Sequence, residues 1–188
     1  MSKKLTALAM ILMLASAVPA RADVLLTPFL GVTFGGDTPN EQVNFGASVA
    51  FLGGGIFGLE VDAALTPNFF DSDDDSVPLE DSNVSTFMAN LMVAAPSEGP
   101  GIRPYGSGGI GLIRTKVTSV DNLFDFNENS FGVNIGGGII GQMNERVGIR
   151  GDVRYFRSIQ DSEEGDDIDL DLGGFNFWRG SLGVTFRF

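Results

Sequence analysis

The fold is decided by the stretch Asn176-Phe177-Trp178-Arg179-Gly180-Ser181-Leu182-Gly183-Val184-Thr185-Phe186-Arg187-Phe188. Taken in steps of two, one face of this stretch is apolar apart from a single glycine: Trp178, Gly180, Leu182, Val184, Phe186 and Phe188. The other face is small, polar or cationic: Arg179, Ser181, Gly183, Thr185 and Arg187. Such alternation predicts a β-strand. Aromatic residues at both ends of the apolar face favour a strand of a membrane-spanning β-barrel; the alternative is a half-buried strand of a soluble sandwich or barrel.

The first residues have the features of a secretory signal peptide. Lys3 and Lys4 precede an apolar run over residues 5–18, and Pro19-Ala20-Arg21-Ala22 supplies the small residues of a cleavage site. The apolar run is shorter than the roughly 20 residues of a transmembrane helix. We therefore predict a leader over residues 1–22, cleaved after Ala22, and a single β-barrel domain over residues 23–188.

Composition excludes several classes of function. The whole chain has a formal net charge of −12, and removal of the three basic residues of the leader lowers it to −15. Such an acidic chain is a poor partner for nucleic acid, which binds clustered Lys and Arg. Hydrophobic residues make up 43% of the chain, so it is not expected to be disordered. Because cysteine is absent, disulfides cannot stabilise it, and a closed hydrogen-bond network must.

Seven further segments show similar alternation, and each is about the length that crosses a bilayer as a tilted strand. They are residues 25–35, 42–52, 56–65, 83–95, 102–116, 130–143 and 147–157. The fifth is rich in glycine, and we expect a β-bulge near Gly108-Gly109.

The connections between these segments alternate in length. The second, fourth and sixth, residues 53–55, 96–101 and 144–146, are shorter than their neighbours at 36–41, 69–82, 117–129 and 158–175. Outer-membrane barrels have short periplasmic turns and longer external loops. The polar face of the segments is mostly Gly, Ala, Ser and Asn, which suits the narrow interior of an eight-stranded barrel. The sequence thus predicts an all-β, eight-stranded, antiparallel up-and-down transmembrane β-barrel with its apolar face toward lipid.

The chain resembles the outer membrane protein β-barrel family, the small OmpA-like and OmpX-like barrels of Gram-negative bacteria. The resemblance is carried by Pro104-Tyr105-Gly106-Ser107-Gly108-Gly109-Ile110-Gly111, Phe131-Gly132-Val133-Asn134-Ile135-Gly136-Gly137-Gly138, Arg150-Gly151-Asp152-Val153-Arg154-Tyr155-Phe156 and Gly183-Val184-Thr185-Phe186-Arg187-Phe188. It implies a location in the outer membrane. It also implies that Phe186 and Phe188 are the assembly signal read by the outer-membrane assembly machinery.

Charged residues on the polar face form the first candidate site. They are Glu60, Asp62, Arg150, Asp152, Arg154, Arg179 and Arg187. Paired arginines and carboxylates neutralise each other in a confined space, so we expect an interior charge network that closes the barrel. The alternative is a gate whose pairs exchange to admit small ions.

The longer connections are acidic and form the second candidate site. Six of their acids are weak candidates for a divalent cation such as Ca²⁺, which would bridge to lipopolysaccharide phosphates: Asp71, Asp73, Asp75, Asp167, Asp169 and Asp171. An EF-hand is not expected, because Ser76 stands where that loop needs glycine and Ser82 where it needs glutamate.

The chain contains no His or Cys, so the usual activation of a nucleophile is missing. We expect no catalytic residue and no cofactor. The sequence favours an outer-membrane barrel that presents acidic external loops to lipid, lipopolysaccharide and divalent cations on a largely plugged barrel. The alternative is a narrow channel or conduit for ions or small hydrophobic molecules, which inward Phe29, Met88, Met92 and Ile140 keep open.

Overall fold

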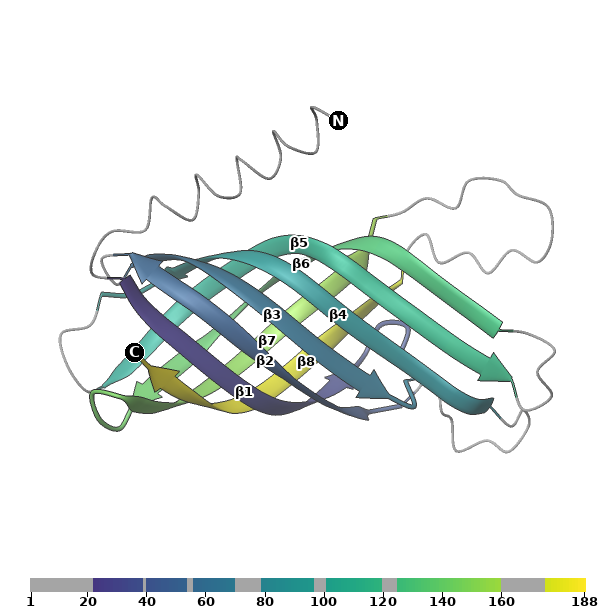
Figure 1. The fold of residues 1–188 in the computed structure, drawn as a ribbon, viewed down its shortest axis with the longest axis horizontal. Coiled ribbons are helices and arrows are strands. Elements are labelled where there is room, and N and C mark those ends of the chain that lie inside the picture. Colours follow the sequence, from purple (N-terminus) through teal and green to yellow (C-terminus); the bar gives the residue numbers. More distant parts are fainter. Residues whose placement is uncertain are drawn as a thin grey trace, which may run out of the picture.

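The computed structural model describes residues 22–38, 40–53, 56–69, 79–96, 101–119, 125–159 and 175–188. In this part of the chain eight strands follow one another: β1 (Ala22–Phe34), β2 (Gln42–Gly53), β3 (Phe57–Pro67), β4 (Leu79–Ala94), β5 (Ile102–Ser119), β6 (Asp125–Gln142), β7 (Val147–Ser158) and β8 (Asn176–Arg187). Each pairs antiparallel with the next, and β8 pairs with β1 to close the barrel (Figure 1). The predicted up-and-down barrel is therefore confirmed.

The start of β1 and the end of β8 lie at the same end of the barrel (Figure 1). Closure runs through register pairs such as Leu30 with Leu182 and Phe34 with Trp178. Backbone groups at an open edge in lipid would cost several kcal/mol each, so this seam is what makes the sheet compatible with a bilayer. No helix in the described part of the chain is both long and apolar enough to span a membrane.

Three strands are longer than predicted at the end opposite the start of β1. β4 begins at Leu79 instead of residue 83, β5 continues to Ser119, and β6 begins at Asp125. The predicted connection 117–129 is therefore shorter than expected, because β5 and β6 remain paired up to Thr118 and Asp125. The ladders of β4 with β5 and of β5 with β6 continue through these extensions.

The predicted bulge near Gly108-Gly109 was wrong. The register of β5 against β6 is unbroken from Ile102 to Thr118, and the only irregularity of the β4–β5 ladder lies between Leu79 and Asp81. The tight packing inside the barrel explains instead why glycine stands at the inward position 109. A Cβ on Gly109 would overlap the backbone oxygen of Ala89 and the side chain of Asn90.

The outer wall is apolar around the whole ring. Exposed apolar side chains include Leu30, Phe45, Leu59, Leu91, Ile110, Ile135, Val153 and Leu182. A soluble protein rarely exposes so continuous an apolar surface, whereas a barrel in a bilayer requires it. Tyr155 and Trp178, at neighbouring positions of β7 and β8, lie 5.2 Å apart between ring centroids toward one end of this belt.

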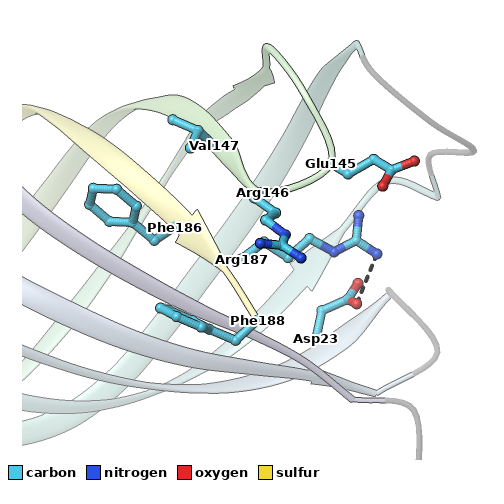
Figure 2. A pocket seen from close by; sticks show the side chains of 7 residues that line it. All are labelled: Asp23, Glu145, Arg146, Val147, Phe186, Arg187 and Phe188. Carbon is cyan, nitrogen blue, oxygen red and sulfur yellow. Dashed lines mark hydrogen bonds and ion pairs between the residues drawn. The ribbon is translucent and has the colours of Figure 1, made fainter.

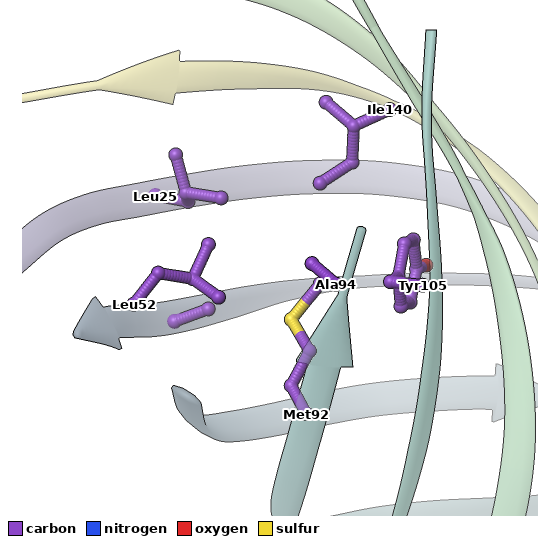
Figure 3. Close-up of a cluster of buried hydrophobic side chains, with 7 residues drawn as sticks. Leu25, Leu52, Met92, Ala94, Tyr105 and Ile140 are labelled. Atoms are coloured by element: carbon purple, nitrogen blue, oxygen red, sulfur yellow. The ribbon is translucent and has the colours of Figure 1, made fainter. Parts of the chain in front are cut away.

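Two separate apolar clusters fill the two ends of the interior. The first lies at the end that holds the start of β1 and consists of Leu25, Ala50, Leu52, Met92, Ala94, Tyr105 and Ile140 (Figure 3). The second lies toward the other end and consists of Phe69, Val84, Met88, Ile113, Phe156, Phe175 and Phe177. Polar and charged side chains occupy the space between them.

Candidate functional site in the barrel lumen

Three strands supply the charged side chains that the sequence predicts inside the lumen. Successive side chains of a strand point to opposite faces, so Glu60 and Asp62 on β3 both point inward. Arg150, Asp152 and Arg154 do the same on β7, and Arg179 does so on β8. All six side chains are buried, and Arg154 is only 1% exposed. The structure thus places six of the seven predicted charges inside the barrel.

Glu60 is the centre of this cluster, because two arginines from β7 bind it. Arg150 Nη1 lies 2.5 Å from Glu60 Oε2, and Arg154 Nη2 lies 2.6 Å from Glu60 Oε1. Arg154 Nε also donates to Asp152 Oδ1 at 2.7 Å. A further pair, Arg179 with Asp62 at 2.9 Å, lies beside these groups. Together the three guanidinium groups and three carboxylates form a charged layer across the lumen, and this layer carries no net formal charge.

Neutral side chains extend the cluster across the lumen. The Tyr105 hydroxyl donates to Asp152 and accepts a bond from Arg150 Nε at 2.6 Å. On the other side, Asn90 Nδ2 donates to Glu60 Oε1 at 3.2 Å, and Asn134 Nδ2 donates to Asn90 Oδ1 at 2.7 Å. These bonds connect β3, β4, β5, β6 and β7 through one network, in which the loss of one member leaves its partners without bonds.

Arg179 joins the charged layer to the second apolar cluster. Its guanidinium lies 4.8 Å from the ring centroid of Phe29 and 4.9 Å from that of Phe156. Arg179 Nε and Nη1 have no hydrogen-bond partner, and cation–π contact with the two rings compensates part of this loss. Phe156 stacks in turn on Phe177, with ring centroids 5.0 Å apart.

A small cavity remains between the ion pairs. It has a volume of about 10 Å³ and is bordered by Ser48, Asp62, Arg150, Asp152 and Arg154. That is room for about one water molecule, and its walls are polar enough to bind one. In the described residues, side chains rather than an open passage fill the middle of the lumen.

Arg187 differs from the prediction, because the structure does not bring it into the network. Its Nη2 lies 2.8 Å from Asp23 Oδ1 at the mouth of the barrel, and both side chains are partly exposed (Figure 2). Arg187 pairs across the seam with Leu25, a member of the first apolar cluster. The cluster therefore separates Arg187 from Glu60 and Asp152. An open hollow beside it is bordered by Asp23, Glu145, Arg146 and Phe188.

Sequence reasoning missed two inward residues of β5, Arg103 and Tyr105. Both lie an even number of residues from Ile113, which the alternation already predicts to point inward. A bulge at Gly108-Gly109 would have reversed the faces of the residues before it, so the alternation did not predict that Arg103 and Tyr105 point inward. Arg103 is buried, and its Nε donates to the backbone oxygen of Ala95 at 2.8 Å.

The remaining predicted sites are placed only in part. Asp71, Asp73, Asp75, Asp167, Asp169 and Asp171 lie outside the described residues. Within the described residues, no three His, Cys, Asp or Glu side chains are grouped as a metal site requires. Phe186 and Phe188 point outward and are exposed; their role as an assembly signal stays a prediction.

A closed barrel with a lipid-facing wall and a polar, filled lumen defines a transmembrane β-barrel protein. The sequence model of the outer membrane protein β-barrel domain matches residues 6–188, and the chain belongs to this family of outer-membrane proteins. No curated protein sequence matches the chain.

Solved structures show the same fold at low identity. The N-terminal β-barrel domain of Pseudomonas aeruginosa OprF is 16% identical, with a TM-score of 0.59 over 89% of this chain and 100% of that one. Neisserial surface protein A is 14% identical, with a TM-score of 0.60 over 88% and 95%. OprG from Pseudomonas aeruginosa is 13% identical, with a TM-score of 0.63 over 89% and 96%. At these identities the likeness concerns the fold alone.

Proposed function

We propose that the protein is a non-conducting barrel of the outer membrane with a structural or surface-interaction role. The observation that carries this proposal is the layering of the lumen. A neutral layer of ion pairs lies between two apolar clusters, one at each end of the barrel. A hydrated ion would have to cross both clusters and break buried charge pairs, and breaking such a pair costs about 3–5 kcal/mol.

The work of such a barrel lies at its surface. Its acidic connections, with Asp71, Asp73 and Asp75 in one and Asp167, Asp169 and Asp171 in another, would bind divalent cations and through them the phosphates of lipopolysaccharide. The strand ends that flank these connections, at Pro67 and Leu79 and at Ser158 and Asn176, lie opposite the start of β1, at the end that is external in outer-membrane barrels. Millimolar Ca²⁺ should therefore bind the refolded protein in calorimetry, and the absence of any heat of binding would refute this part of the proposal.

The alternative function is a narrow ion channel. It is favoured by one feature of the network: Glu60 and Asp152 each contact both Arg150 and Arg154, so the pairs can exchange partners without leaving a charge alone. A conduit for apolar molecules receives less support. Met88 and Met92, the flexible inward side chains that would line it, belong to different clusters with the charged layer between them.

Catalysis is not part of the proposal. Glu60 and Asp62 are the two inward carboxylates of β3, and both are bound by arginines in the closed interior. A general acid or base must reach the proton it transfers, and within the described part of the chain these groups face no open cleft. A lipid-product assay in which wild-type protein releases product and Glu60→Gln does not would contradict this view.

Planar-bilayer conductance separates the closed barrel from the channel. Wild-type protein, Arg150→Ala and Glu60→Ala are reconstituted at equal protein content, with Arg146→Ala as the control because Arg146 is exposed at the barrel mouth. The closed barrel predicts negligible current from all four proteins. Discrete openings in wild type that change in size or frequency in Arg150→Ala or Glu60→Ala, but not in Arg146→Ala, would establish the channel instead.

A further inference from the structure

An open groove lies on the outer wall where β6, β7, β8 and β1 run side by side. It has a volume of about 840 Å³, and its surface is almost entirely apolar. Three glycines, Gly137, Gly151 and Gly180, border it where a side chain would otherwise stand, and larger side chains such as Leu30, Ile139 and Leu182 rise beside them. Concave apolar surface of this size suits a hydrocarbon chain.

The barrel itself does not require two of these glycines. A Cβ on Gly180 would lie 3.6 Å from Phe34 Cε1, and a Cβ on Gly151 would lie 3.5 Å from Leu182 Cδ2, both ordinary contact distances. The inward Gly109 differs, since a Cβ there would overlap backbone. The hollow at Gly151 and Gly180 is thus not forced by the packing of the strands.

Polar groups lie in order beyond the groove toward the external end. On β7 and β8 the paired positions are Val153 with Gly180 in the groove, then Tyr155 with Trp178, then Arg157 with Asn176. Arg157 is four residues beyond Val153, about 13 Å along a strand. Because the strands of such barrels tilt by about 35–45°, this is about 10 Å along the bilayer normal, which lies within the roughly 15 Å of hydrocarbon in one leaflet. The order from groove to cation matches the order from acyl chain to phosphate in a lipid.

Among the described residues, no acidic side chain competes with an anion for Arg157. Its side chain is exposed, and no ion pair or hydrogen bond of that side chain is found among the described residues. Asp37, on the neighbouring β1–β2 connection, accepts instead from the backbone N–H and side-chain amide of Asn176, at 2.7 and 3.0 Å. A guanidinium group binds phosphate through a fork of two parallel hydrogen bonds.

We propose that the groove and Arg157 form a binding site for lipopolysaccharide of the outer leaflet. One acyl chain lies along Gly180 and Gly151, the Tyr155–Trp178 pair contacts the base of the head group, and a lipid A phosphate pairs with Arg157. The assignment to lipopolysaccharide follows from the external position of Arg157, since this is the phosphate-bearing lipid of that leaflet. The site does not depend on a closed lumen, so a conducting barrel would leave it intact.

Trp178 is the single tryptophan of the chain, and its fluorescence reports on the lipid beside it. The refolded full-length barrel is placed in vesicles of phosphatidylcholine with brominated acyl chains, which quench Trp178, and unbrominated rough-type lipopolysaccharide is added. Displacement of brominated lipid restores fluorescence. Wild type should recover at low mole fractions, and Arg157→Ala should need about tenfold more lipopolysaccharide, because one charge-assisted contact is lost. Gly180→Leu, which fills the groove, should shift recovery in the same direction.

Two matched variants control for charge and bulk. Arg146→Ala removes an exposed cation at the opposite end, and Gly106→Leu adds a side chain at an outward glycine that has open space but does not border the groove. Both should recover as wild type does. Heat-modifiable migration verifies that each variant is folded, and Arg157→Gln replaces Arg157→Ala if the latter does not fold. Equal recovery of wild type and the Arg157 variant, or equal recovery with phosphatidylglycerol in place of lipopolysaccharide, would overturn the proposal.

Discussion

Arg154 and Arg157 lie three residues apart on β7 and face opposite environments. Arg154 points into the lumen, where it binds Glu60 and Asp152 and is 1% exposed. Arg157 points outward and is exposed. In the charged layer of the lumen each ionised side chain therefore has a partner of opposite charge. On the outer wall a side chain needs only to be compatible with lipid or with the lipid–water interface. The same kind of substitution should have very different effects on the two faces.

The largest effect is expected from Arg154→Ala. Removal of this guanidinium leaves Glu60 and Asp152 buried with fewer partners, and breaking a buried pair in this way costs about 3–5 kcal/mol. Urea unfolding in detergent micelles, followed by tryptophan fluorescence, measures the free energy of unfolding. Arg157→Ala should change it by no more than about 0.5 kcal/mol, and equal losses in the two variants would refute the contrast between lumen and wall.

A charge on the wall should have the next largest effect. Leu182 is exposed on the apolar face, 69% by area, in the middle of β8. Leu182→Arg should destabilise the folded barrel in vesicles by about 2–4 kcal/mol, as an arginine does near the bilayer midplane. Leu182→Met, which stays apolar and similar in volume, is the control. If Leu182→Arg were neutral in unfolding from vesicles, β8 would not face lipid as the structure has it.

A smaller effect should distinguish inward from outward glycines. Gly109→Ala forces a Cβ against the backbone oxygen of Ala89 and should cost about 1–3 kcal/mol, the cost of overpacking. Gly106→Ala adds the same methyl group where the only neighbour lies 3.9 Å away, and its effect should be close to zero. The pair is compared by urea unfolding in micelles; equal effects would mean that the interior is less tightly packed than described.

The alternation of the sequence predicts which face each residue takes, because a barrel strand in a membrane has only two environments to separate. Eight strands, the lipid-facing side and six inward charges follow from that rule. Outside the bilayer a strand no longer has to separate an apolar from a polar face, so the alternation did not locate the extensions of β4, β5 and β6. The wrongly predicted bulge at Gly108-Gly109 also left the inward position of Tyr105 unpredicted, although Tyr105 alternates in step with the inward Ile113.

Partners across the lumen could not be derived from the sequence. Whether Arg150 and Arg154 reach Glu60 depends on how far the strands are staggered when the sheet closes, a quantity of the whole ring that no single segment contains. Arg187 shows the consequence. Its parity is compatible with the interior, but its position at the end of β8 brings it to Asp23, beyond the first apolar cluster.

Water access to Arg154 tests the closed lumen most directly. In nitrogen-15 spectra of the refolded barrel, the Nε–H of Arg154 and that of Arg157 are assigned by loss of each signal in Arg154→Lys and Arg157→Lys, and their exchange with solvent is timed. A neutral layer closed between two apolar clusters predicts that the Arg154 proton, bonded to Asp152 at 2.7 Å, persists while the Arg157 proton exchanges rapidly. Equally rapid exchange at both positions would show that water passes through the lumen and would contradict the account.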